Sequence, residues 1–102
     1  MSKKPPKAYR DFLATYPRLG EAWDVAREAE EDGPLDEKTR RLIKLAVAVG
    51  AMRQGAVSSA ARKARAVGVG DEEIRQVVTL AASTLGFPSA VAIFTWVEGT
   101  AP

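Results

Sequence analysis

The chain has 102 residues, of which 46% are hydrophobic and 27% are charged, with a formal net charge of +2. These values are typical of one folded globular domain. The sequence has no cysteine and no histidine, which excludes disulfides, thiolate or imidazole metal sites, and both Ser-His-Asp and Cys-His catalysis.

The chain begins with MSKKPPK, which is charged and lacks the apolar core of a signal peptide. The longest apolar run, Leu45–Met52, is too short to span a bilayer. We therefore expect a cytoplasmic protein that does not contact a membrane. It should have a flexible basic tail at residues 1–5 and a single domain at residues 6–102.

The rest of the chain is predicted to be all-α, because no segment alternates polar and apolar residues between turn signals as a strand does. Tyr9, Phe12 and Leu13 give the first helix an apolar face, and Pro17 ends or kinks it. The six predicted helices are Pro6–Tyr16, Leu19–Glu31, one capped by Asp36 and running to about Met52, Ala56–Val67, one opening at Gly70–Glu73 and broken at Gly86, and Ser89–Val97.

The third predicted helix is mostly apolar. Between Leu42 and Met52 it carries one charge, Lys44, and a helix that is apolar nearly all round is expected to be central and buried. Its small residues, including Ala46 and Gly50, are expected to let neighbouring backbones approach closely.

Charge is divided unevenly along the sequence. Between Glu21 and Glu37 there are eight acidic residues and one basic residue, and between Lys38 and Arg65 there are eight basic residues and no acidic one. The favoured interpretation is that acidic and basic helices face each other, within a subunit or between subunits. Nucleic acid is not expected as a partner, because Phe94 and Trp96 have no basic residue within ten positions to support base stacking.

Four segments, TRRLIKLAVA, RQGAV, AVGVGDEEI and GFPSAVAIF, follow one another between Leu35 and Val97. In order and spacing they resemble the core of the carboxymuconolactone decarboxylase and alkylhydroperoxidase D-like superfamily. The resemblance implies a six-helix alkylhydroperoxidase D-like bundle that assembles with itself as a homo-trimer or homo-hexamer.

The resemblance also implies where catalytic groups would lie. In the thiol branch, the positions of a glutamate, two cysteines and a histidine fall on Arg41, Arg53, Ala56 and Ala60. A peroxidatic disulfide cycle needs a thiolate, a resolving thiol and a base. Since all are replaced, thiol peroxidase chemistry by this route is excluded.

The decarboxylase branch resembles the chain more closely. Its R-E-G-E-L turn appears here as Arg53-Gln54-Gly55-Ala56-Val57, without the glutamates and without the histidine that follows. Decarboxylation of a lactone-linked acid needs a cation for the carboxylate and an acid for the developing enolate. Arg53 supplies the cation, but no matched residue supplies the acid.

These observations favour a catalytically degenerate scaffold or a small-anion-binding homo-oligomer. The ligand-binding candidates are Arg53, Arg41 and Ser59, the catalytic residues are unknown, and no metal or cofactor is expected. Arg53 is expected to pair with a carboxylate between Glu21 and Glu37, with Glu98, or with a small carboxylate or phosphate ligand. The alternatives are a lactone decarboxylase-type lyase using Arg53 and a basic nucleic-acid-associated protein using residues 38–65.

Overall fold

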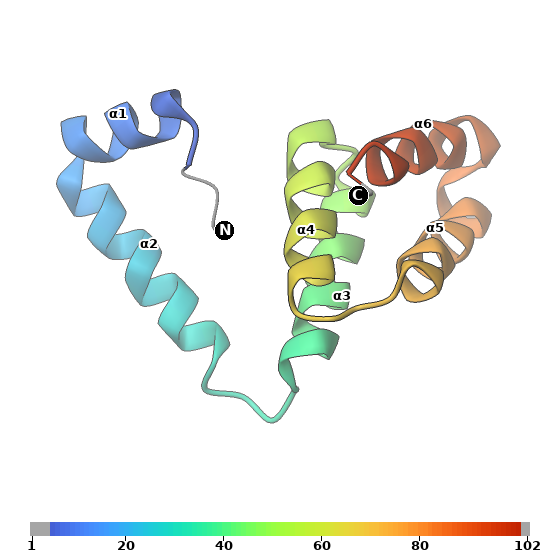
Figure 1. Ribbon diagram of the computed structural model, residues 1–102, viewed down its shortest axis with the longest axis horizontal. Coiled ribbons are helices and arrows are strands. Elements are labelled where there is room, and N and C mark those ends of the chain that lie inside the picture. The colour runs from blue at the N-terminus through green and yellow to red at the C-terminus, as the bar shows by residue number, and fades with distance from the viewer. Residues whose placement is uncertain (1–4, 101–102) are drawn as a thin grey trace. The chain divides into compact units, whose positions relative to one another are not determined.

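The computed structural model describes residues 5–100, which form six α-helices and no strand (Figure 1). The predicted all-α fold is confirmed. Residues 1–4 of the predicted tail lie outside the described residues. The helices are α1 (Lys7–Thr15), α2 (Pro17–Glu30), α3 (Glu37–Gly50), α4 (Gln54–Ala66), α5 (Asp71–Leu85) and α6 (Phe87–Glu98).

Two helices begin earlier than the sequence predicted. α4 begins at Gln54 and α6 at Phe87, so that Gly55 and Pro88 lie inside their first turns. The N–H groups of a first helical turn have no intrahelical partner, so a proline there costs no hydrogen bond. Residues that break a helix interior are therefore tolerated at its start.

The chain divides into two compact units, Met1–Pro34 and Leu35–Pro102. In the first unit, α1 and α2 meet at Tyr16, and Pro17 is the first residue of α2. Gly20 allows the helices to approach, because an added Cβ would lie 3.2 Å from Cδ2 of Leu13. The rings of Phe12 and Tyr16 are tilted by 54° with centroids 5.2 Å apart. No described residue of this unit is buried.

The second unit has the hydrophobic core. α3 packs on α4 and α5, and α6 packs on the same two helices. No charged or polar side chain is buried among the described residues. The core consists of Leu45, Val49, Val57, Ala61, Ala64, Val69, Ile74, Val78, Ile93 and Val97.

The prediction that the third helix is buried all round is wrong for the single chain. Only Leu45 and Val49 of α3 are buried, whereas Ile43 is 45% exposed and Val47 is 67% exposed. α4 and α5 cover the side of α3 that carries Leu45 and Val49. The apolar side that carries Ile43 and Val47 stays in contact with solvent.

The predicted starts of α3 and α5 are confirmed. Oδ1 of Asp36 accepts a hydrogen bond from the N–H of Thr39 at 2.8 Å, so Asp36 is the N-cap of α3. At the start of α5, Oε1 of Glu73 accepts a hydrogen bond from the N–H of Gly70 at 3.0 Å. Acidic residues in the first turn, which include Asp71, also interact favourably with the helix dipole.

α3 and α4 end in the same Schellman arrangement. At the end of α4, Gly68 has φ +91° and donates to the carbonyl of Arg65, while Val69 donates to the carbonyl of Ala64. At the end of α3, Met52 has φ +54° and donates to Val49, and the next residue donates to the carbonyl of Ala48. Glycine adopts this left-handed conformation freely and methionine does not.

Two arginines on the rim of the core tie α4, α5 and α6 together. Nε of Arg65 donates to Oδ1 of Asp71 at 2.9 Å, and its Nη1 donates to the carbonyl of Val97 at 3.1 Å. Arg75 donates to both carboxylate oxygens of Glu98 at 2.8 and 3.1 Å. These bonds hold the pKa values of Asp71 and Glu98 below the usual range for carboxyl groups.

Substitutions at the ends of α4 and α3 are expected to change the stability of the protein in opposite directions. Gly68→Ala should lower the free energy of unfolding by about 1 kcal/mol or more, because alanine is strained at positive φ. The added Cβ would also lie 3.3 Å from Cε of Lys38. Met52→Gly should raise the free energy of unfolding by up to about 1 kcal/mol by removing the strain. Urea unfolding of both variants measures these changes, and a destabilised Met52→Gly variant would contradict the strain assignment.

The ion pairs predict a loss of stability in acid. A carboxyl group with a lowered pKa in the folded protein stabilises it above its unfolded pKa, about 4, and this contribution is lost as pH falls through the folded value. The melting temperature should therefore fall less between neutral and acidic pH in Asp71→Asn or Glu98→Gln than in the wild type. Glu72→Gln is the control, since Glu72 has no ion pair with any described residue. If the melting temperature of both variants falls in acid as much as that of the wild type, the result would contradict a stabilising role for the ion pairs.

Candidate functional site

Arg53 lies in the turn between α3 and α4 and is the N-cap residue of α4. Its side chain is exposed and makes no hydrogen bond or ion pair with any residue in the described part of the chain. The preceding residue, Met52, has the strained left-handed backbone described above. The turn therefore presents an unpaired guanidinium group to solvent.

The start of α4 is electrostatically positive. The N-terminal end of a helix carries a partial positive charge on its unpaired N–H groups. At α4 no side chain caps these groups, and no acidic residue lies in the first turn. Arg53 adds a full positive charge at the same place, which is unfavourable unless an anion is bound. An added Cβ at Gly55 would meet no atom within 4 Å, so the space beside this turn is open.

The other two candidate residues lie elsewhere on the helices. Arg41 is half-buried in the second turn of α3, and the rise of a helix places its Cα about 14 Å along the axis from Gly50. Ser59 is half-buried on α4, about 9 Å along that axis from Arg53. The structure does not gather the three residues into one cluster around Arg53.

Glu98 is not the partner of Arg53. Its carboxylate is bound by both donors of Arg75, whose Nε lies 2.8 Å from Oε1. This pairing could not be predicted from the sequence, because the two residues lie 23 positions apart on different helices.

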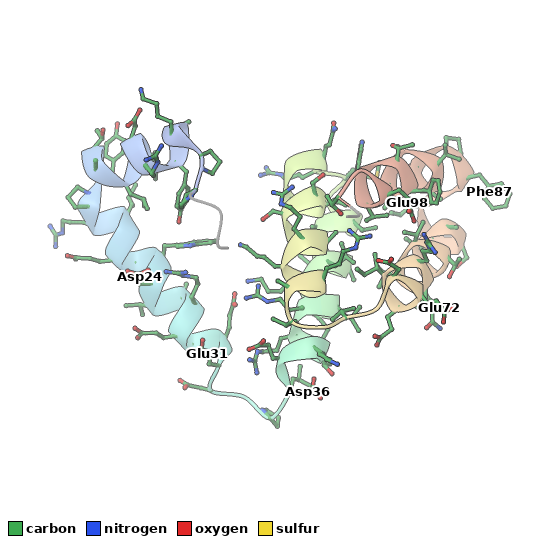
Figure 2. All side chains as sticks on the ribbon, in the orientation of Figure 1. Asp24, Glu31, Asp36, Glu72, Phe87 and Glu98 are labelled. Carbon is green, nitrogen blue, oxygen red and sulfur yellow. The ribbon has the colours of Figure 1, made fainter. Side chains whose placement is uncertain are left out.

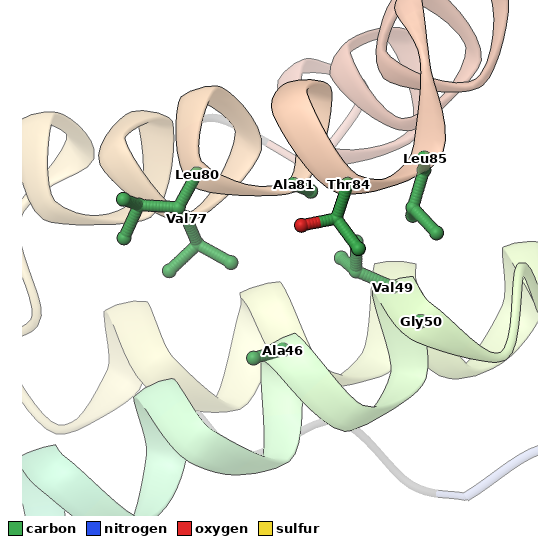
Figure 3. A pocket seen from close by; sticks show the side chains of 8 residues that line it. All are labelled: Ala46, Val49, Gly50, Val77, Leu80, Ala81, Thr84 and Leu85. Atoms are coloured by element: carbon green, nitrogen blue, oxygen red, sulfur yellow. The ribbon is translucent and has the colours of Figure 1, made fainter.

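An apolar pocket of about 270 Å³ lies between α3 and α5 (Figure 3). Small side chains on both helices leave this space open, and Thr84 is its polar lining residue. Its hydroxyl makes no hydrogen bond with any described residue, unlike that of Thr79, which donates to the carbonyl of Gln76 at 2.8 Å. The pocket is lined by Ala46, Val49, Gly50, Val77, Leu80, Ala81, Thr84 and Leu85.

This pocket is not among the features that the sequence predicts. The signal was present in Ala46 and Gly50, which were expected to allow close contact between backbones. The two helices instead leave a hollow between them, which larger residues on α5, including Leu80, also line. Arg53, Arg41 and Ser59 do not line it.

Two further classes of site are not found among residues 5–100. No group of three or more carboxylates there is placed to hold a metal ion. None of the helices in this range has the length and apolar character needed to cross a membrane.

The chain is similar to known proteins over most of its length. Residues 17–99 match the family model described as the carboxymuconolactone decarboxylase family. The fold is similar to the crystal structure of apo-lpg0406, a carboxymuconolactone decarboxylase family protein from Legionella pneumophila, with a TM-score of 0.80 and 26% identity. That match covers 91% of this chain and 84% of the other.

No curated protein matches the sequence. The family match nevertheless spans residues from α2 to the end of α6, and the solved structure agrees with it in fold. The chain belongs to the carboxymuconolactone decarboxylase family.

Proposed function

We propose that this protein is a catalytically degenerate member of its family that binds a small carboxylate or phosphate at Arg53 and works as a homo-oligomer. The observation that carries the proposal is the unpaired guanidinium of Arg53 at the uncapped start of α4. A planar guanidinium binds a carboxylate or phosphate through two parallel hydrogen bonds. First-turn N–H groups next to it favour the same kind of ligand.

The residues at the family's catalytic positions support binding without thiol chemistry. By the family resemblance, the positions of the glutamate, the two cysteines and the histidine of the thiol branch fall on Arg41, Arg53, Ala56 and Ala60. These replacements remove the nucleophile and the base, and the arginine at position 53 adds a positive charge at the proposed site. Binding of an anion needs positive charge alone, whereas decarboxylation also needs an acid that no matched residue supplies.

Exposed apolar side chains support assembly. Within one chain, seven large apolar residues of the second unit are at least 45% exposed, and Phe87 projects from the start of α6 (Figure 2). Patches of this kind on soluble proteins commonly mark interaction surfaces. The seven residues are Leu35, Ile43, Val47, Leu80, Phe87, Val91 and Phe94.

The anion proposal predicts a thermal shift that depends on Arg53. Phosphate or a small carboxylate at roughly ten times its Kd should add about 1.4 kcal/mol by mass action. This should raise the melting temperature by several degrees. Arg53→Ala should abolish the shift. Arg62→Ala is the matched control, because it removes another exposed guanidinium, from α4 itself and away from its first turn. A shift retained in Arg53→Ala, or absent from the wild type, would refute the proposed site.

The assembly proposal predicts a mass of three or six copies of the 10.9 kDa chain. Light scattering on the purified protein at micromolar concentration measures this mass directly. A single-chain mass under these conditions would rule out the homo-oligomer and leave the anion site untouched.

A further inference from the structure

One face of α3 and one face of α5 form the walls of the apolar pocket. On α3 the lining residues are Ala46, Val49 and Gly50, and on α5 they run from Val77 to Leu85 at the spacing of one helical face. Val49 is only 2% exposed and belongs to the hydrophobic core. The packing of the second unit therefore fixes the base of the pocket, and the small residues beside it leave the space unfilled.

The pocket contains a hydroxyl group that no described residue binds. Hydroxyl groups within helices commonly donate to a backbone carbonyl one turn earlier, and those of Thr79, Ser83 and Thr95 do so at 2.8, 3.3 and 2.6 Å. The hydroxyl of Thr84 makes no such bond. Figure 3 shows the Thr84 side chain between the two helices, with its oxygen pointing into the space that separates them. This oxygen is free to bind a ligand.

The lining restricts what can occupy the pocket. None of its lining residues is charged, and a charged group is costly to move into apolar surroundings without a partner. A bound water needs at least two polar partners, whereas the lining side chains provide one hydroxyl. A dry cavity of about 150 Å³ binds benzene, so a pocket of about 270 Å³ holds on the order of ten non-hydrogen atoms.

The pocket lies beside the apolar surface of α3 that is proposed for assembly. Ile43 and Val47, the most exposed large apolar residues of α3, do not line it. Leu80 lines it and is 66% exposed, which places this residue at the rim. Subunit contacts are packed as densely as protein interiors. Small-molecule sites are instead hollows, mostly apolar with a few polar groups, and in helical bundles they lie between helices.

We propose that the pocket between α3 and α5 binds a small neutral ring compound of about ten non-hydrogen atoms, with one carbonyl or hydroxyl oxygen bonded to the hydroxyl of Thr84. The ring packs on Val49, Val77 and Leu85, which line the pocket. Arg53 does not line it, so this site goes beyond the proposed anion site and does not depend on it.

A titration with a neutral ketone tests the site directly. 1-Indanone has the required size and a single oxygen, and it should shift the methyl NMR signals of Val49, Val77 and Leu85 in a saturable way, with a Kd on the order of 1 mM or tighter. Benzoate should leave these methyl signals unchanged, because the pocket has no cation. The absence of saturable indanone binding, or benzoate binding at these methyl groups, would overturn the proposal.

Filling the pocket should abolish indanone binding. Ala46→Leu fills it from α3 and Ala81→Leu fills it from α5, and leucine is a good helix former, so helix content in circular dichroism should not change. Ala66→Leu is the matched control, since Ala66 is exposed on α4 and does not line the pocket. Wild-type affinity in both filled variants would overturn the proposal. So would a reduced mass of Ala46→Leu in light scattering, which would show that a second copy of the chain occupies the pocket.

The role of the hydroxyl has its own test. Thr84→Val removes the oxygen and keeps the shape of the side chain, so it should weaken indanone binding by roughly threefold to tenfold, the effect of one hydrogen bond. Thr79→Val is the matched control on α5, because the hydroxyl of Thr79 donates to the carbonyl of Gln76 and the residue does not line the pocket. Equal indanone affinities of Thr84→Val and the wild type would contradict the proposed recognition of the oxygen.

Discussion

The second unit depends on close packing around α4. Ala61 and Ala64 are fully buried, and their small side chains let α4 contact both α3 and α6. Because no charged side chain is buried among the described residues, the core stays apolar and Arg65 is held at its edge by Asp71. The same packing fixes the direction of the turn that carries Arg53, since that turn joins α3 to α4.

Most of the helices could be predicted because their ends are set by local chemistry. Asp36 as an N-cap, Gly68 at a left-handed position and the carboxylates that open α5 each act within a few residues. Contacts between distant residues could not be predicted in this way. The pairing of Arg75 with Glu98, and the hollow between α3 and α5, depend on how helices lie in space.

The exposure of α3 shows a further limit of sequence patterns. Periodicity identifies apolar faces, but it does not show whether the same chain covers them. Ile43 and Val47 look like core residues in the sequence and are exposed in the single chain. The sequence predicts that Arg53 follows the third helix, and the structure has it in the turn before α4, whereas its lack of a partner within the described residues became visible only in the structure. That Arg41 and Ser59 lie away from that turn likewise became visible only in the arrangement of the helices.

The open space at Gly55 has a consequence for how this scaffold can change. A Cβ at this position would meet no atom within 4 Å, and the residue lies in the first turn of α4, two positions after Arg53. A larger residue can therefore replace this glycine without its Cβ meeting the core. The surface beside the guanidinium can thus change in sequence while the packing of the second unit stays as it is.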